Sequence, residues 1–204
     1  MRVCIQTKSS PRWLVLLIQV SLYAMVAMGA HPIDIRGNPG GLAAMAPGVA
    51  KLFCREQTSL GTMKLRRGEV NYVVFANDEA YVGPLVILVD GRSASTSEVL
   101  AGGLQEMGRA TIVCERTLGA VLPSVIEKLP TGARLQYAIA DLKTPKGTLL
   151  EGRGVIPDVP VPITRRSLLL GGDPGLKKAT AIILNKTTKI EAQRTARFTV
   201  FKTS

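Results

Sequence analysis

The stretch that decides the fold is "PLVILVDGRSASTSEVLAGGLQEMGRATIVC", residues 84–114. It opens with an almost unbroken apolar run whose start is marked by Pro84, as expected for a strand buried on both faces. A helix is predicted over "STSEVLAGGLQEMG", because Leu100, Leu104 and Met107 recur at the spacing of one helical face. The run "RATIVCE" predicts a second strand. Strand, helix and strand in this order predict a layered α/β core with a largely parallel sheet.

The segments before this stretch predict further elements of the same core. The sequence "HPIDI", residues 31–35, alternates like a short strand and leads into the glycine-rich "RGNPGG". A helix is predicted over "LAAMAPGVAKLF", residues 42–53, interrupted or restarted at Pro47. Residues 59–83 then predict a hairpin-rich insertion with turns at Gly68 and Asn77.

The segments after residue 114 are less regular. The sequence "RLQYAIADLKTPKG", residues 134–147, predicts one further strand closed by a turn that contains proline. Residues 177–204, "KKATAIILNKTTKIEAQRTARFTVFKTS", predict a helix that trails into a disordered basic tail. We therefore expect residues 31–165 to form the domain and residues 166–204 to form a basic C-terminal tail.

Four residues at the expected junction of strand and helix, Ser95 to Glu98, fit two different roles. The pattern S-x-x-E is that of a capping box, in which side chains satisfy the unpaired amides at a helix start. A serine at such a turn also lies beside amide donors and the positive end of the helix dipole, where an oxyanion is stabilised. Position alone favours the cap, because serine is common there.

The N-terminus has the layout of an export signal. A basic stretch, "MRVCIQTKSSPRW", precedes the apolar "LVLLIQVSLYAMVAMGA", which ends in small residues. This apolar stretch is shorter than the roughly 20 residues that comfortably span a bilayer. Residues 1–30 are therefore expected to be a signal peptide cleaved near Gly29 or Ala30, or a retained membrane anchor that associates through residues 13–30. We therefore expect a protein that is exported to the periplasm or the extracellular space, or one that is anchored in a membrane.

The charge of the chain lies mainly at its two ends. The 204 residues carry a formal charge of +11, of which residues 1–30 contribute +3 and residues 176–204 contribute +6. The near-neutral segment between them lacks the basic stripe and the aromatic side chains of a nucleic-acid-binding domain. We therefore expect no nucleic acid partner.

Cysteine and histidine limit the chemistry further. Cys54 and Cys114 lie in apolar segments without metal-binding spacing, which predicts buried free thiols. His31 is the one histidine of the chain, which argues against multi-histidine metal sites and against most Ser/His/Asp arrangements. We expect neither a metal nor a cofactor.

Five segments occur in an order that resembles the carboxyl-terminal-processing (tail-specific) serine peptidases: "IDIRGNPGG", "GPLVILVDGRSASTSE", "GRATIVCERTLGA", "LPTGARLQYAIADLKTPKG" and "GRGVIPDVPV". The resemblance covers residues 33–163 and implies a crotonase/ClpP-like α/β fold of stacked ββα units. It also implies a peptide or protein substrate, Ser95 as the acyl-enzyme nucleophile, and an oxyanion hole formed by the amides of Thr96 and of Gly40 or Gly41.

The sequence departs from the family at the general base. Members with a Ser/Lys dyad carry the lysine in a G-K-G segment 25 residues after the nucleophile, where this chain has Ala120. Alanine has no titratable group and cannot accept the serine proton. Lys128 lies about 26 Å further along an extended strand, and His31 lies about 20 Å of extended chain before Gly37. Neither residue is an obvious substitute.

The second departure is the short sequence before the glycine-rich motif. The resemblance implies additional strands there, so we expect a core that is incomplete at its N-terminal side, with unpaired edges. Three hypotheses follow: a serine-type peptidase domain, a non-catalytic peptide-binding remnant that keeps the groove, or a gene fragment without function.

Overall fold

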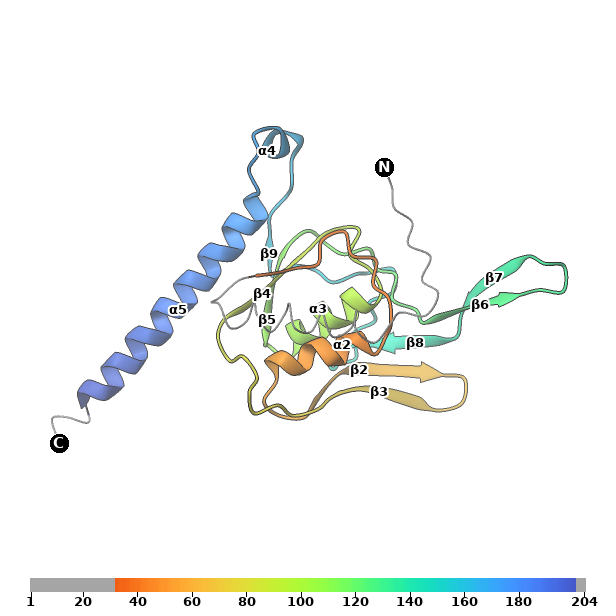
Figure 1. Cartoon of the computed structure of the whole chain (residues 1–204), viewed down its shortest axis with the longest axis horizontal. Helices are drawn as coiled ribbons and strands as arrows, with labels where there is room; N and C mark the ends of the chain where they lie inside the picture. Colours follow the sequence, from red (N-terminus) through yellow and green to blue (C-terminus); the bar gives the residue numbers. More distant parts are fainter. Residues whose placement is uncertain (1–31, 201–204) are drawn as a thin grey trace.

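The computed structural model describes residues 32–200 (Figure 1). The expected leader and His31 lie outside the described residues, so the predictions for them stay predictions. The described chain forms an α/β core with two projecting parts, a hairpin on one side and a long helix on the other. The α/β class predicted from the sequence is confirmed.

A parallel sheet lies at the centre of the core. It consists of β1 (Ile33–Asp34), β4 (Leu85–Val89), β5 (Ala110–Cys114) and β9 (Val159–Pro160), in the order β1-β4-β5-β9. All five residues of β4 are buried, and this strand pairs in parallel with both β1 and β5. The strand predicted from the apolar run is therefore central in the sheet, with the two-residue β1 at its edge.

Two helices cover one face of this sheet. They are α3 (Thr96–Glu106) and α2 (Met45–Ala50), the latter continuing into the 3₁₀ turn η1 (Lys51–Phe53). The predicted apolar stripe of α3 is confirmed, because Leu100 and Leu104 are buried against the core. The chain therefore buries this helical face on the strands that flank it in sequence.

A second, antiparallel sheet lies on the other side of α3. It contains β2 (Thr58–Leu65), β3 (Glu69–Val74) and β8 (Ala140–Lys143), in the order β3-β2-β8. Packing of α3 on β2 is close, since a Cβ added at Gly103 would lie 2.7 Å from the Leu60 side chain. Sheet, helix and sheet thus form three layers, and the predicted hairpin turn at Gly68 joins β2 to β3.

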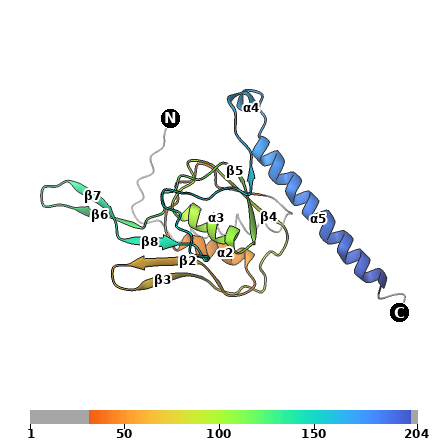
Figure 2. The same cartoon turned by 180° about the vertical axis from the view of Figure 1, so that it is seen from behind.

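The predicted strand over residues 134–147 is wrong in one respect, because two strands in different sheets replace it. β7 (Arg134–Ala138) pairs with β6 (Ser124–Lys128) in a hairpin that projects from the core in both views (Figures 1 and 2). After Ile139 the chain enters β8 of the antiparallel sheet. Lys128 is exposed on the projecting hairpin.

The C-terminal segment forms α4 (Arg165–Leu169) and α5 (Pro174–Val200). The first turns of α5 cover the second face of the parallel sheet, where Ala179 and Ile183 are buried with residues of β4 and β5. Within residues 32–200, no helix combines the length and apolar character needed to cross a bilayer. The predicted C-terminal helix therefore contributes to the core and is helical through Val200.

Candidate active site

Ser95 occupies a strained turn between β4 and α3. It is the residue before the first turn of the helix and has φ 54° and ψ −122°, a conformation that side chains of L-amino acids rarely adopt. Such strain persists where the surrounding structure holds it, and it clusters at functional sites. The prediction that Ser95 begins the helix after the central strand is confirmed.

Glu98 holds this turn from within the core. Its carboxylate is fully buried and accepts a hydrogen bond from the Ser95 amide at 3.0 Å. This contact is the glutamate half of the capping box predicted from the sequence. The same carboxylate also accepts hydrogen bonds from the Thr117 hydroxyl and from the amides of Gly119 (2.7 Å) and Ala120 (3.0 Å). One buried side chain therefore connects the serine turn to a loop more than twenty residues later.

Ala120 lies directly beside Ser95. The Ser95 amide donates a hydrogen bond to the Ala120 carbonyl at 2.9 Å, so the two backbones are in contact. The Ala120 side chain is exposed, which leaves room for a longer residue at this position. The structure thus brings residue 120, where the family resemblance implies a lysine, next to the serine, and the alanine there has no titratable group.

The glycine-rich loop packs against the other side of the turn. A Cβ added at Gly40, which has φ +90°, would lie 2.7 Å from the Cβ of Ser95. The Thr96 hydroxyl donates to the Gly41 carbonyl at 3.0 Å, and the Ala94 amide donates to the Asn38 carbonyl at 3.0 Å. The predicted packing of this loop beside Ser95 is confirmed, and only glycine fits at position 40.

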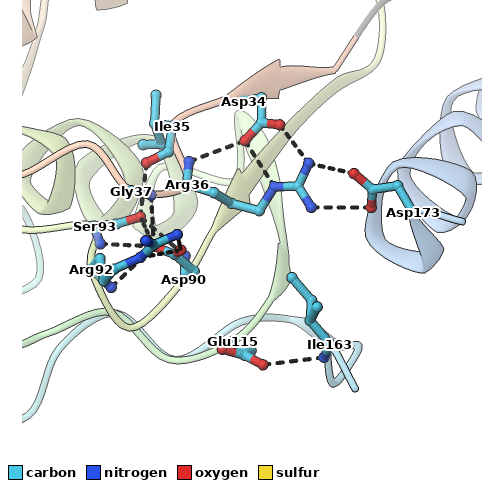
Figure 3. Close-up of polar contacts among 10 residues, drawn as sticks. All are labelled: Asp34, Ile35, Arg36, Gly37, Asp90, Arg92, Ser93, Glu115, Ile163 and Asp173. Atoms are coloured by element: carbon cyan, nitrogen blue, oxygen red, sulfur yellow. Dashed lines mark hydrogen bonds and ion pairs between the residues drawn. The ribbon is translucent and has the colours of Figure 1, made fainter. Parts of the chain in front are cut away.

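Asp90 and Ser93 fix the start of that loop to the end of β4 (Figure 3). The Asp90 carboxylate accepts hydrogen bonds from the amides of Gly37 (2.8 Å), Arg92 and Ser93, and the Ser93 hydroxyl donates to the Ile35 carbonyl at 2.8 Å. Burial by itself raises the pKa of the Asp90 carboxyl, but the hydrogen bonds from Gly37, Arg92 and Ser93 outweigh it. The net pKa is lowered, which keeps Asp90 ionised.

A second ionic cluster joins the same motif to α5. Arg36 lies between two carboxylates, donating from Nε to Asp34 at 2.9 Å and from Nη1 to Asp173 at 3.0 Å (Figure 3). These hydrogen bonds raise the pKa of the Arg36 guanidinium, and the bonds from Arg36 lower the pKa of Asp173. Asp173 also caps α5 by accepting from the Leu176 amide at 2.9 Å. The C-terminal helix is therefore attached to the glycine-loop motif.

An apolar groove of about 350 Å³ opens beside the serine turn. Its wall includes Gly40, Gly41 and Thr96, whose backbones adjoin Ser95. Most of its lining is apolar and includes Leu42, Met45, Val49 and Leu100, and Asp34 and Asn38 add polar groups. The groove is continuous with the predicted oxyanion hole, so a bound side chain would lie next to Ser95.

These elements recur in known proteins. Residues 28–161 match peptidase family S41. The chain belongs to this family. A carboxyl-terminal-processing protease of Picosynechococcus sp. is 35% identical over 144 residues, which are 70% of this chain and 34% of that protein. The chloroplastic carboxyl-terminal-processing peptidase 3 of Arabidopsis thaliana is 36% identical over 131 residues, 64% of this chain and 25% of that protein.

The fold agrees with a solved member of the family. The photosystem II D1 C-terminal processing protease superposes with a TM-score of 0.62 at 32% identity, covering 71% of this chain and 38% of that chain. This S41 chain therefore spans between 25% and 38% of the length of these three relatives.

Sequence reasoning missed several residues that shape the S41 site. The sequence pattern indicates only a capping role for Glu98, although this side chain also accepts hydrogen bonds from the 117–120 loop. The motifs of the sequence do not point to Asp90 or Glu151, although Glu151 accepts hydrogen bonds from the amides of Val121 (2.8 Å) and Leu122 (3.2 Å) beside Ala120. The sequence feature that could indicate Asp90 is a carboxylate directly after a fully apolar strand.

Among the described residues, no cluster of His, Cys, Asp and Glu is placed to hold a metal ion.

Proposed function

We propose that residues 31–165 are a serine-type peptidase domain of the C-terminal-processing kind, with Ser95 as nucleophile. The observation that carries this proposal is the strained position of Ser95 between the glycine loop and α3. In the proposed reaction, Ser95 Oγ forms a bond to the carbonyl carbon of a peptide and, because residue 120 is alanine, gives its proton to solvent water. The C–N bond breaks, the amine leaves with a proton, and water hydrolyses the ester.

The proposed oxyanion hole consists of the amides of Thr96 and Gly41. Thr96 is the first residue of α3, so its amide has no acceptor within the helix and lies at the positive end of the dipole. The sequence left Gly40 and Gly41 as alternatives. The Gly40 amide already donates to Asn38 Oδ1 at 2.9 Å, and this favours Gly41 as the second donor.

The proposed substrate is a peptide or protein that places an apolar side chain in the groove. Leu42, Met45 and Leu100 supply an apolar surface beside Thr96 and Gly41, where the residue preceding the cleaved bond would lie. An acidic side chain in this groove would lose hydration and would face the carboxylate of Asp34, which also lines it. We therefore expect a preference for peptides with apolar residues at that position.

The missing base predicts slow chemistry. A positioned general base typically contributes about 10² to 10⁴-fold in rate. We expect the unmodified chain to cleave a peptide very weakly or below detection, and Ala120→Lys to raise the rate within that range. The measurement is turnover of a fluorogenic peptide with an apolar residue before the cleaved bond. Ala120→Met is the matched control, because it has a similar length and no titratable group.

A Ser95→Ala substitution completes this test. Activity gained by Ala120→Lys should disappear when Ser95→Ala is added. If the unmodified chain cleaves the peptide in a Ser95-dependent way and Ala120→Lys does not increase the rate, the base comes from another residue and the dyad analogy is wrong.

The second candidate is a non-catalytic peptide-binding domain, favoured by the exposed alanine at the base position. A covalent serine probe separates the two candidates. Labelling that disappears in Ser95→Ala supports the peptidase. Peptide binding by a folded chain that no probe labels, with or without Ala120→Lys, supports the binding domain.

We further propose that the protein is exported or held at a membrane by residues 1–30. The support is the order of a basic stretch, an apolar stretch and small residues in the sequence. Mass determination of the protein purified from its source would distinguish cleavage near Gly29 or Ala30 from a retained leader.

A further inference from the structure

Two leucines at one corner of the molecule are more exposed than any other large apolar side chain of the described residues. Leu169 is 73% exposed and Leu170 is 75% exposed. Leu169 is the last residue of α4 and Leu170 follows it, and α4 stands outside the layered core at the turn into α5 (Figures 1 and 2). A single exposed leucine is ordinary on a protein surface, but an adjacent pair on a projecting turn indicates contact with another surface.

Basic residues flank this pair in the sequence. Arg165 and Arg166 are exposed and precede the two leucines by four residues each, and the Leu170 amide donates to the Arg166 carbonyl as in a helical turn. Arginine and leucine at this spacing share one side of the turn. The first turn of α5 adds two exposed lysines. We name these six residues the α4 corner: Arg165, Arg166, Leu169, Leu170, Lys177 and Lys178.

No acidic side chain between residues 164 and 178 is free to neutralise the basic residues of the α4 corner. Between residues 164 and 178 the sequence contains four basic residues and one acid, Asp173. Asp173 is engaged by Arg36 and by the cap of α5. The exposed side chains of Lys186 and Lys189 extend the positive charge along α5. The corner therefore combines two exposed leucines with four exposed basic residues and no free acid of its own segment.

We propose that the α4 corner docks on an anionic lipid surface. Leucine side chains enter the boundary between headgroups and acyl chains, and the surrounding cations contact the lipid phosphates and carboxylates. A second copy of the chain is a poorer occupant, because a two-fold contact brings each patch of cations against the same patch of its partner. The proposal is independent of the peptidase chemistry and of the leader.

The test is hydrogen–deuterium exchange of the full chain, followed peptide by peptide. Vesicles of phosphatidylcholine are compared with vesicles that also contain phosphatidylserine. We expect slower exchange over residues 165–178 only with the anionic vesicles, and no change in the β6–β7 hairpin. Because the readout is local, vesicle binding through the leader does not imitate the expected result.

Two double substitutions sharpen the test. Arg165→Gln combined with Arg166→Gln should reduce the affinity for anionic vesicles, measured from the local protection, by about tenfold or more. Each basic residue near an anionic surface raises that affinity several-fold. Leu169→Ser with Leu170→Ser should remove the protection. Two controls change exposed residues of the same kinds elsewhere. They are Lys64→Gln combined with Arg66→Gln, and Leu184→Ser, and both should leave the protection of residues 165–178 intact.

Three results would overturn the proposal. The first is unchanged exchange over residues 165–178, either because the protein binds anionic vesicles elsewhere or because it does not bind them. The second is protection that the two double substitutions leave intact. The third is protection that rises with chain concentration in the absence of lipid, which would assign the corner to self-association.

Discussion

Glu98 is the residue on which the geometry around Ser95 depends. Its buried carboxylate accepts hydrogen bonds from the Ser95 amide, the Thr117 hydroxyl and the amides of Gly119 and Ala120. Each of these groups is a donor, and the two oxygens of the Glu98 side chain accept from all four. The side chain that caps α3 therefore also determines where residue 120 lies relative to the serine.

Glu98→Gln tests this role. The amide NH₂ of glutamine would face two of the donors, leaving buried groups unsatisfied at a cost of about 1–3 kcal/mol. We expect a lower free energy of unfolding in urea by that amount, and loss of any activity gained by Ala120→Lys. Glu127→Gln on the exposed hairpin is the control and should change stability little. Equal urea midpoints for the two variants would contradict the role assigned to Glu98.

At the scale of elements, α5 explains why β4 is apolar along its whole length. Residues of β4 that point away from α3 pack on Ala179 and Ile183 of α5. The sequence predicted a strand buried on both faces but did not indicate which segment covers the second face. The ion pair between Arg36 and Asp173 fixes the start of the covering helix.

The substitution Ile183→Ala should destabilise the protein substantially. Ile183 is fully buried between α5 and the sheet, and truncation of such a residue typically costs about 2–5 kcal/mol. Ile190→Ala, two turns further along the same helix at an exposed position, is the matched control and should cost far less. Thermal or urea unfolding of both variants provides the measurement, and similar losses would indicate that α5 does not cover the sheet.

At the scale of the whole molecule, two separate apolar clusters lie on the two faces of the parallel sheet. Cys54 belongs to the cluster around α3, and Cys114 belongs to the cluster under α5. Both are buried free thiols, as the sequence predicted. Burial raises the pKa of the Cys114 thiol to about 11, so at neutral pH very little thiolate is available there.

Alkylation of these thiols therefore reports on opening of each face. At neutral pH we expect iodoacetamide to modify Cys54 and Cys114 only when urea unfolds the chain, as followed by mass spectrometry of the separate peptides. Ile183→Ala should accelerate modification of Cys114 more than that of Cys54, because only Cys114 lies under α5. Equal acceleration of both would mean that the two faces open together.

The sequence by itself determined the local elements and the family. The strand at residues 85–89, the capped helix after it and the turn at Gly68 depend on periodicity and on residues a few positions apart, which a sequence displays directly. It also located Ser95 and the alanine at the base position through the family motifs. Their catalytic roles remain proposals.

Only the tertiary structure decided which distant groups meet. Three contacts join residues that are far apart in the sequence: Ile183 is buried on β4, the Ala120 amide donates to Glu98, and Arg36 pairs with Asp173. The assignment of β7 and β8 to different sheets also depends on pairing with distant strands. Arg36 and Asp173 are 137 positions apart, and no short-range pattern predicts such a pair. These contacts depend on how whole elements pack, because the core must bury both faces of one sheet and satisfy every polar group that this burial removes from water.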